Sequence, residues 1–123
     1  ISAFGSIAVA DNNLTLEATD LPLNQFGFFL ASRTQGFVAN PGGSQGNICL
    51  GAPIARFNAV GGYSIGNSGT SGSISLLIDM GNIPLTPVTS ILAGETWNFQ
   101  AWYRDLNPTN TSNFTDGLSV TFQ

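Results

Sequence analysis

The segment from Thr96 to Arg104 alternates between two kinds of side chain, and it constrains the fold more than any other part of the chain. Aromatic and apolar residues occupy every second position: Trp97, Phe99, Ala101 and Tyr103. The intervening positions are polar apart from one indole: Thr96, Asn98, Gln100, Trp102 and Arg104. A period of two residues is typical of a β-strand with one buried face. The segment therefore predicts a strand whose first set of side chains lies in the core.

Similar but shorter alternating runs occur along the rest of the chain, at residues 14–19, 73–79 and 117–123. The 15 glycines and 6 prolines interrupt the sequence so often that no amphipathic helix of useful length can form. Short strands separated by turn residues are typical of β-sandwiches and barrels. We therefore expect an all-β fold: one domain over residues 1–123, built as a two-sheet antiparallel β-sandwich or jelly roll of about eight to ten strands.

Residues 1–10 are predicted to form a terminal strand that pairs either within the domain or with the sheet edge of a neighbouring subunit. A terminal strand can complete the sheet of another copy, as in donor-strand pili. The apolar residues that would mediate such an exchange are Ile1, Ala3, Phe4, Ile7 and Val9. The sequence alone leaves both kinds of pairing open.

Charged residues make up only 8% of the chain, with three Lys or Arg against seven Asp or Glu and no histidine. Typical soluble domains carry about a quarter charged residues. Binding to nucleic acid or to anionic lipid depends on clustered cations, and we therefore expect neither partner. No apolar run approaches the roughly 20 residues of a membrane span, so membrane insertion is not expected either. A weakly charged surface repels its own copies little, which favours close packing of many subunits.

Catalytic chemistry is not expected from this composition. With no histidine and a single cysteine, the usual nucleophile–base pairs and structural zinc sites cannot be built. A glycosidase would need paired carboxylates, and the only glutamates are Glu17 and Glu95. Both fall at polar strand positions or strand edges, where a solvated surface carboxylate is the simpler interpretation.

Trp102 is the residue best suited to bind a ligand. An exposed indole beside Asn98, Gln100 and Arg104 would resemble the stacking platforms of carbohydrate-binding modules. The alternative is that Trp102 packs under a loop or against the second sheet. Extracellular glycans are accordingly a second class of partner to consider.

Calcium is the only cofactor that the sequence suggests. Asp105, Asn107, Thr109, Asn113 and Asp116 follow the ligand spacing of an EF-hand loop. Asn110 stands where the turn glycine belongs, and no flanking helices are expected. A polar loop rich in Asx turns explains the same residues.

Two further features concern modification. Asn13, Asn110 and Asn113 begin Asn-x-Ser/Thr sequons, which predict surface exposure and glycosylation. Cys49 is the only cysteine and lies between Ile48 and Leu50, so no internal disulfide can form. We expect a small buried apolar side chain, with an intermolecular disulfide as the alternative.

Two segments resemble a known kind of module. They are Gln25 to Phe57, which contains the run Asn40-Pro41-Gly42-Gly43-Ser44, and Ala93-Gly-Glu-Thr-Trp-Asn-Phe-Gln-Ala-Trp-Tyr-Arg-Asp105 with Ser112 to Phe122. They resemble an uncharacterised β-rich module near the C-termini of large secreted proteins of planctomycete-like bacteria. The resemblance implies an extracellular or cell-surface setting and supplies no catalytic residues.

Together these features predict a secreted, non-enzymatic structural protein, located outside the cell after removal of a signal peptide. The chain begins at Ile1 without a signal sequence, which fits a processed protein or an excised domain. Its main expected partners are copies of itself in a filament or surface layer, as in a pilus. The alternative is a carbohydrate-binding or adhesive module.

Overall fold

The computed structural model describes all 123 residues and contains eleven β-strands and three short 3-10 helices, with every strand pair antiparallel. A three-stranded sheet has the order β1-β2-β8, formed by Ser2–Gly5, Leu14–Ala18 and Ile74–Ile78. A six-stranded sheet has the order β10-β9-β3-β6, formed by Thr111–Phe114, Thr96–Asp105, Phe26–Ser32 and Ala55–Arg56. Its other two strands are β11 (Leu118–Thr121), paired with β9, and β7 (Gly66–Asn67), paired with β3.

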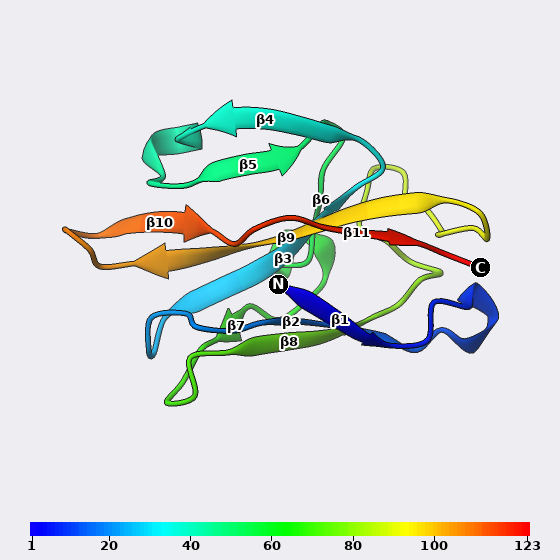
Figure 1. Ribbon diagram of the computed structural model, residues 1–123, viewed down its shortest axis with the longest axis horizontal. Helices are drawn as coiled ribbons and strands as arrows, with labels where there is room; N and C mark the ends of the chain where they lie inside the picture. Colours follow the sequence, from blue (N-terminus) through cyan, green and yellow to red (C-terminus); the bar gives the residue numbers. More distant parts are fainter.

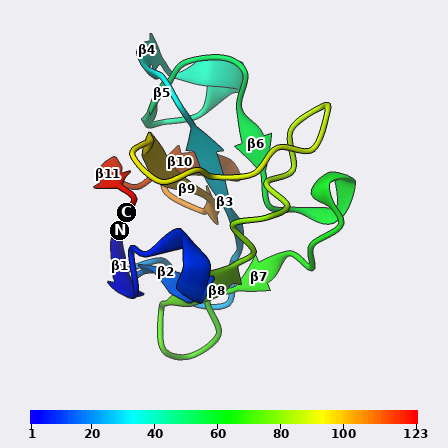
Figure 2. The same cartoon turned by 90° about the vertical axis from the view of Figure 1, so that its right-hand side faces the viewer.

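A separate hairpin forms a third layer. Strands β4 (Gln35–Ala39) and β5 (Asn47–Leu50) pair only with each other. In both views the hairpin lies above the six-stranded sheet, while the three-stranded sheet lies below it (Figures 1 and 2). The 3-10 helices η1 (Val9–Asp11), η2 (Pro41–Gly43) and η3 (Ala59–Gly61) lie in the connections. The expected all-β sandwich is confirmed, with the hairpin as an addition that the sequence did not suggest.

Strand β9 is the centre of the six-stranded sheet. It is the longest strand, with 10 residues, and pairs with β3 on one side and with β10 and β11 in succession on the other. Trp97, Phe99 and Ala101 are fully buried, as the alternation predicts, and Tyr103 is half-buried near the strand end. The central strand predicted from periodicity is therefore confirmed.

The apolar core lies between the three-stranded and six-stranded sheets. Its largest buried side chains are Trp97, Phe57, Phe99, Phe122, Leu14, Leu16, Ile78, Met80, Ile83 and Ile91. They come from both sheets and from the connections between them. Since burial of each large side chain contributes roughly 1.5–3 kcal/mol, this layer supplies most of the hydrophobic stabilisation.

The prediction of one strand over residues 1–10 is wrong. Strand β1 ends at Gly5, whose φ of +106° only glycine adopts readily. Any side chain at this position would also collide with the backbone oxygen of Asn13. Beyond Gly5 the chain turns, and Val9 begins η1. Strand β1 pairs with β2 of its own chain, from Ser2 opposite Glu17 to Gly5 opposite Leu14.

No helix in the structure is long and apolar enough to cross a membrane.

Candidate interaction surfaces

Two of the polar side chains of β9 that the sequence marked as ligand contacts, Asn98 and Gln100, are buried. Asn98 is 6% exposed and Gln100 is 0% exposed, because β5 lies over this face of the six-stranded sheet. No buried side-chain nitrogen or oxygen in the molecule lacks a hydrogen-bond partner. The prediction that Asn98 and Gln100 face a ligand is therefore wrong, and their partner is the β4–β5 hairpin.

Gln100 uses its amide to hold this hairpin and the connection between β10 and β11. Its Oε1 accepts from the backbone N–H of Cys49 at 3.0 Å, and its Nε2 donates to the carbonyl oxygens of Asn47 at 2.9 Å and Thr115 at 2.7 Å. Asn98 acts in the same way, since its Oδ1 accepts from Gln35 Nε2 at 3.1 Å and its Nδ2 donates to the Ser32 carbonyl at 3.2 Å. These bonds anchor both hairpin strands to β9.

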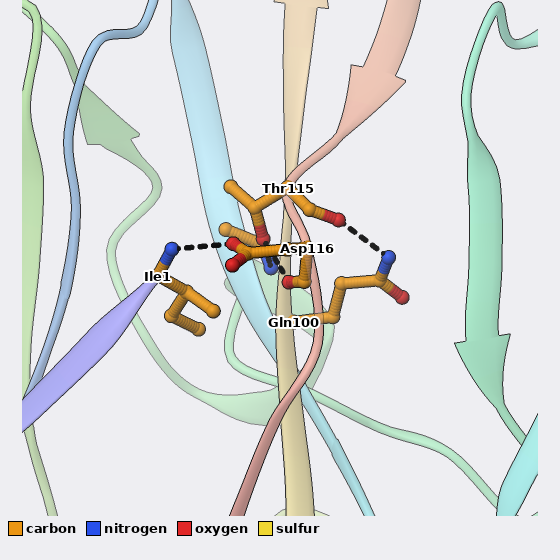
Figure 3. A network of polar contacts seen from close by, with 5 residues as sticks. Ile1, Gln100, Thr115 and Asp116 are labelled. Atoms are coloured by element: carbon orange, nitrogen blue, oxygen red, sulfur yellow. Dashed lines mark hydrogen bonds and ion pairs between the residues drawn. The ribbon is translucent and has the colours of Figure 1, made fainter.

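The connection between β10 and β11 is tied to β9 by a second set of polar contacts (Figure 3). The Thr115 hydroxyl accepts from the N–H of Ala101 at 3.0 Å and donates to the carbonyl of Asp116 at 2.8 Å. The carboxylate of Asp116 accepts from the ammonium group of Ile1 at 2.7 Å. Through Ile1, this contact links the three-stranded sheet to the six-stranded one.

Trp102 and Arg104 remain at the surface. The Trp102 ring is half-buried and packs on Phe28 of β3, with 5.0 Å between ring centroids and 32° between planes. The guanidinium carbon of Arg104 lies 5.7 Å from the Trp102 ring centroid, within cation–π distance. Part of the indole surface is thus already occupied by two neighbours, and the flat platform predicted around Trp102 is reduced to a partly covered ring.

Glu95 lies in a compact cluster with Trp97 and Arg33. Its Oε2 accepts from Trp97 Nε1 at 2.9 Å and from the N–H of Leu92 at 3.0 Å, and its Oε1 pairs with Arg33 at 3.0 Å. Arg33 also lies over the Trp97 ring, 4.9 Å from its centroid. Burial raises the pKa of Glu95, but the two hydrogen bonds and the Arg33 charge outweigh it, so the pKa is lowered overall.

We expect Glu95→Gln to lower the free energy of unfolding at pH 7 by about 1 kcal/mol, because the charged partner of Arg33 and Trp97 is lost. A lowered carboxyl pKa stabilises the fold above the unfolded-state pKa of about 4.3 and stops doing so as pH falls through the folded-state value. The difference between the two proteins should therefore shrink below about pH 4.

Urea unfolding across this pH range measures the effect. Glu17→Gln is the matched control, because Glu17 on β2 has no hydrogen bond or ion pair through its side chain and should change stability by less than about 0.5 kcal/mol. Equal losses from both substitutions, or a Glu95→Gln loss that persists unchanged in acid, would contradict the assignment.

The residues proposed to exchange as a terminal strand are divided between core and surface. Ile1, Ala3 and Val9 pack against the core of their own chain, whereas Phe4 is 54% exposed and Ile7 is 39% exposed. The backbone of Ile7 and Val9 pairs with Gln123, at 2.9 and 2.8 Å. Pairing within the domain is thus the arrangement observed for this segment.

The residues that follow the ligand spacing of an EF-hand loop do not surround a common site in the structure. Asp105 lies opposite Thr111 in the β9–β10 hairpin, while Asp116 lies beyond β10, near the register of Gln100. At about 3.3 Å per strand residue, the backbone positions of Asp105 and Asp116 are roughly 15 Å apart along the sheet. Asp105 accepts from the N–H groups of Leu106 at 2.8 Å and Asn107 at 3.3 Å, as in an Asx turn. Thr109 lies in the exposed hairpin connection.

The sequon asparagines and Cys49 lie at different depths. Asn13 and Asn110 are exposed, whereas Asn113 is half-buried on β10 and its Oδ1 accepts from Phe114 N at 2.9 Å. Cys49 is a free thiol, half-buried on β5. Cys49 is therefore less buried than expected, and glycosylation of the asparagines and an intermolecular disulfide at Cys49 remain predictions.

Sequence reasoning missed the most exposed strand of the molecule. All five residues of β4 are exposed, including Phe37 at 69% and Val38 at 53%. The strand pairs with β5 along one edge, and its other edge faces outward at the margin of the molecule (Figure 1). The signal that could have found it is the Gly36-Phe37-Val38-Ala39 run followed by the turn-rich residues 40–47, a pattern that fits a hairpin.

No protein-family model, curated protein or solved structure matches this chain at a significant level. The resemblance to secreted bacterial modules therefore depends on the sequence motifs alone and stays a prediction.

Proposed function

We propose that this chain is a non-enzymatic structural protein of an extracellular assembly and that it associates with copies of itself through the edge of β4. The observation that carries the proposal is the unprotected state of that edge. Native proteins protect edge strands with charge, proline, strong bulges or a covering element, because an open edge pairs readily with another chain. Strand β4 contains neither charge nor proline, and no segment covers it. The only protective feature of β4 is an irregularity in its register with β5, between Gln35 and Val38.

The β4 edge is also firmly held. Gln35 on β4 donates to Asn98 and to Ser119, and the partner strand β5 is held by Gln100. A preorganised strand loses less conformational entropy on pairing than a mobile one. This support favours a role for the edge in binding over accidental exposure.

A second copy is a suitable occupant because identical strands bring identical groups together. In an antiparallel pair with a two-fold axis at Phe37, the two phenyl rings meet and Val38 faces Gly36 of the other copy. On either side of the paired rings, Val38 and Gln35 oppose the small residues Gly36 and Ala39, and no like charges meet. The low charge of the whole chain, −4, adds little repulsion between copies.

Growth beyond a dimer needs a second contact, and the outer face of the three-stranded sheet offers one. Phe4 on β1 and Leu77 on β8 both lie opposite Thr15, so the three side chains form one row. Phe4 is 54% exposed and Leu77 is 57% exposed. The three-stranded sheet that carries this row lies on the opposite side of the molecule from β4, as an open chain of subunits requires (Figure 2).

Light scattering after size-exclusion chromatography, over a range of concentrations, tests the proposal. We expect the wild type to grow with concentration, and we expect Phe37→Lys and Leu77→Lys each to stop at dimers, because each substitution places a charge in one of the two contacts that growth needs. Leu106→Lys is the matched control, since Leu106 is 56% exposed in the β9–β10 connection and away from both surfaces. A wild type that stays monomeric throughout, or a Phe37→Lys protein that assembles normally, would refute the proposal.

The carbohydrate-binding alternative has weaker support. Two of its four predicted contacts, Asn98 and Gln100, are hydrogen-bonded inside the molecule, and Trp102 packs against Phe28. Only Arg104 and part of one ring remain to meet a sugar on this face.

A further inference from the structure

A concavity of the molecule lies away from both β4 and Trp102. It is an open cleft of about 740 Å³ between the β6–η3 segment and the connection that follows β8. Small-molecule sites usually have volumes of roughly 300–1,000 Å³. Its polar lining groups are Arg56, Tyr63, Asn82 and Thr86, and its apolar walls include Val60 and Pro84.

The walls of the cleft are fixed by internal contacts. Asn58 caps η3 through its Oδ1, which accepts from Val60 N at 3.1 Å, and Tyr63 packs edge-on against the buried Phe57 at 5.1 Å. The opposite wall is held by pairing of Ile83 with Thr89. The two walls meet at Gly61, where an added Cβ would lie 2.9 Å from the Pro84 ring. The cleft is therefore preformed.

Arg56 is the only charged residue that lines the cleft. Arg56 is exposed and forms no ion pair, and no Asp or Glu lines the cleft. Of the other two arginines, Arg33 is neutralised by Glu95, and Arg104 lies on the sheet face beside Trp102. In a chain with more than twice as many acids as bases, a concave site with one free guanidinium and no carboxylate in its lining favours an anion beside Arg56.

The remaining groups favour hydroxyl-bearing ligands. Asp79, just outside the cleft, accepts from Asn82 Nδ2 at 2.8 Å, which orients the amide and leaves Asn82 Oδ1 without a partner in the chain. Burial and then the nearby Asp79 charge raise the pKa of Tyr63, so its hydroxyl stays protonated and can donate. One cation is better matched to a carboxylate than to a doubly charged phosphate, which usually takes several donors.

We propose that this cleft binds an acidic sugar, with the uronate carboxylate on Arg56 and ring hydroxyls on Asn82, Thr86 and Tyr63. The proposal is independent of assembly through β4, because none of these residues lies on that edge or on the Phe4–Leu77 row. A single exposed ion pair with a few hydrogen bonds gives weak affinity, and NMR titration is the suitable method.

The probe is trigalacturonic acid, added to the ¹⁵N-labelled protein at low salt, with its methyl ester as the uncharged comparison. We expect backbone shifts at Arg56, Tyr63 and Asn82, weaker binding of the ester, and a roughly tenfold or greater loss of affinity in Arg56→Gln. Arg104→Gln is the matched control, because it removes the same charge from another surface without touching the cleft.

Equal losses in Arg56→Gln and Arg104→Gln would show a general charge effect and overturn the proposal. Equal binding of acid and ester, or no shifts at the highest soluble probe concentration, would overturn it as well. Since Arg56 is exposed, its replacement should leave the spectrum of the unbound protein unchanged outside the cleft, which verifies that the variant is folded.

Discussion

Gln100→Leu is expected to lower the free energy of unfolding by about 3 kcal/mol, although glutamine and leucine have similar size and leucine is the more apolar. The substitution leaves three partly buried backbone groups without partners: Cys49 N–H, Asn47 C=O and Thr115 C=O. An unsatisfied buried polar group costs about 1–3 kcal/mol, and partial access of water to the hairpin reduces the sum. The loss should therefore exceed that of most single substitutions, which lie between about 0.5 and 3 kcal/mol.

Urea denaturation measures the global effect, and hydrogen exchange locates it. The Cys49 amide hydrogen should exchange faster in Gln100→Leu than in the wild type, because its acceptor is gone. Gln45→Leu is the matched control: Gln45 is exposed in the hairpin loop, its side chain forms no hydrogen bond, and stability should change by less than about 0.5 kcal/mol. If Gln100→Leu were as stable as the wild type, the hairpin would not depend on the hydrogen bonds of Gln100.

The same residue shows where sequence reasoning reached its limit. Alternation identified the buried face of β9 correctly, because Trp97 and Phe99 are apolar and periodic. The pattern equates polar with solvent-exposed and therefore places Gln100 on a ligand surface. Its actual partner, Cys49, is 51 residues away in the chain and contributes a backbone group, which leaves no signature in the sequence. Polar anchoring of a third layer therefore could not be predicted from the pattern.

Errors at the chain start and in the candidate calcium loop have a related origin. The apolar residues at positions 1–10 suggest one strand, but the backbone turns at Gly5, and a glycine in a run of this kind fits either a strand interior or its end. Asp105 and Asp116 have loop spacing in sequence, yet the hairpin register separates them. In both cases strand pairing, which depends on distant segments, decided the outcome. Local turn chemistry was predicted correctly where it acts alone, as in the Asx turn at Asp105.

Trp97→Ala should be the most destabilising substitution in the chain, with a loss of about 4 kcal/mol. Trp97 is 0% exposed in the core between the sheets, so truncation leaves a cavity as well as losing buried surface. Its removal also takes the indole donor from Glu95 and the ring from beneath Arg33. Trp102→Ala removes the same side chain from the same strand, five positions along, where the residue is only partly buried.

The comparison of these two tryptophans tests the whole interpretation of β9. Because Trp102 loses mainly its contact with Phe28 and an exposed cation–π contact, the expected loss in Trp102→Ala is about 1–2 kcal/mol, less than half that of Trp97→Ala. Urea unfolding followed by circular dichroism measures both variants without depending on tryptophan fluorescence. Equal losses would mean that Trp102 is buried as deeply as Trp97, which would place another layer over the outer face. A larger loss for Trp97→Ala would establish that the core lies on the side that the alternation of β9 predicts.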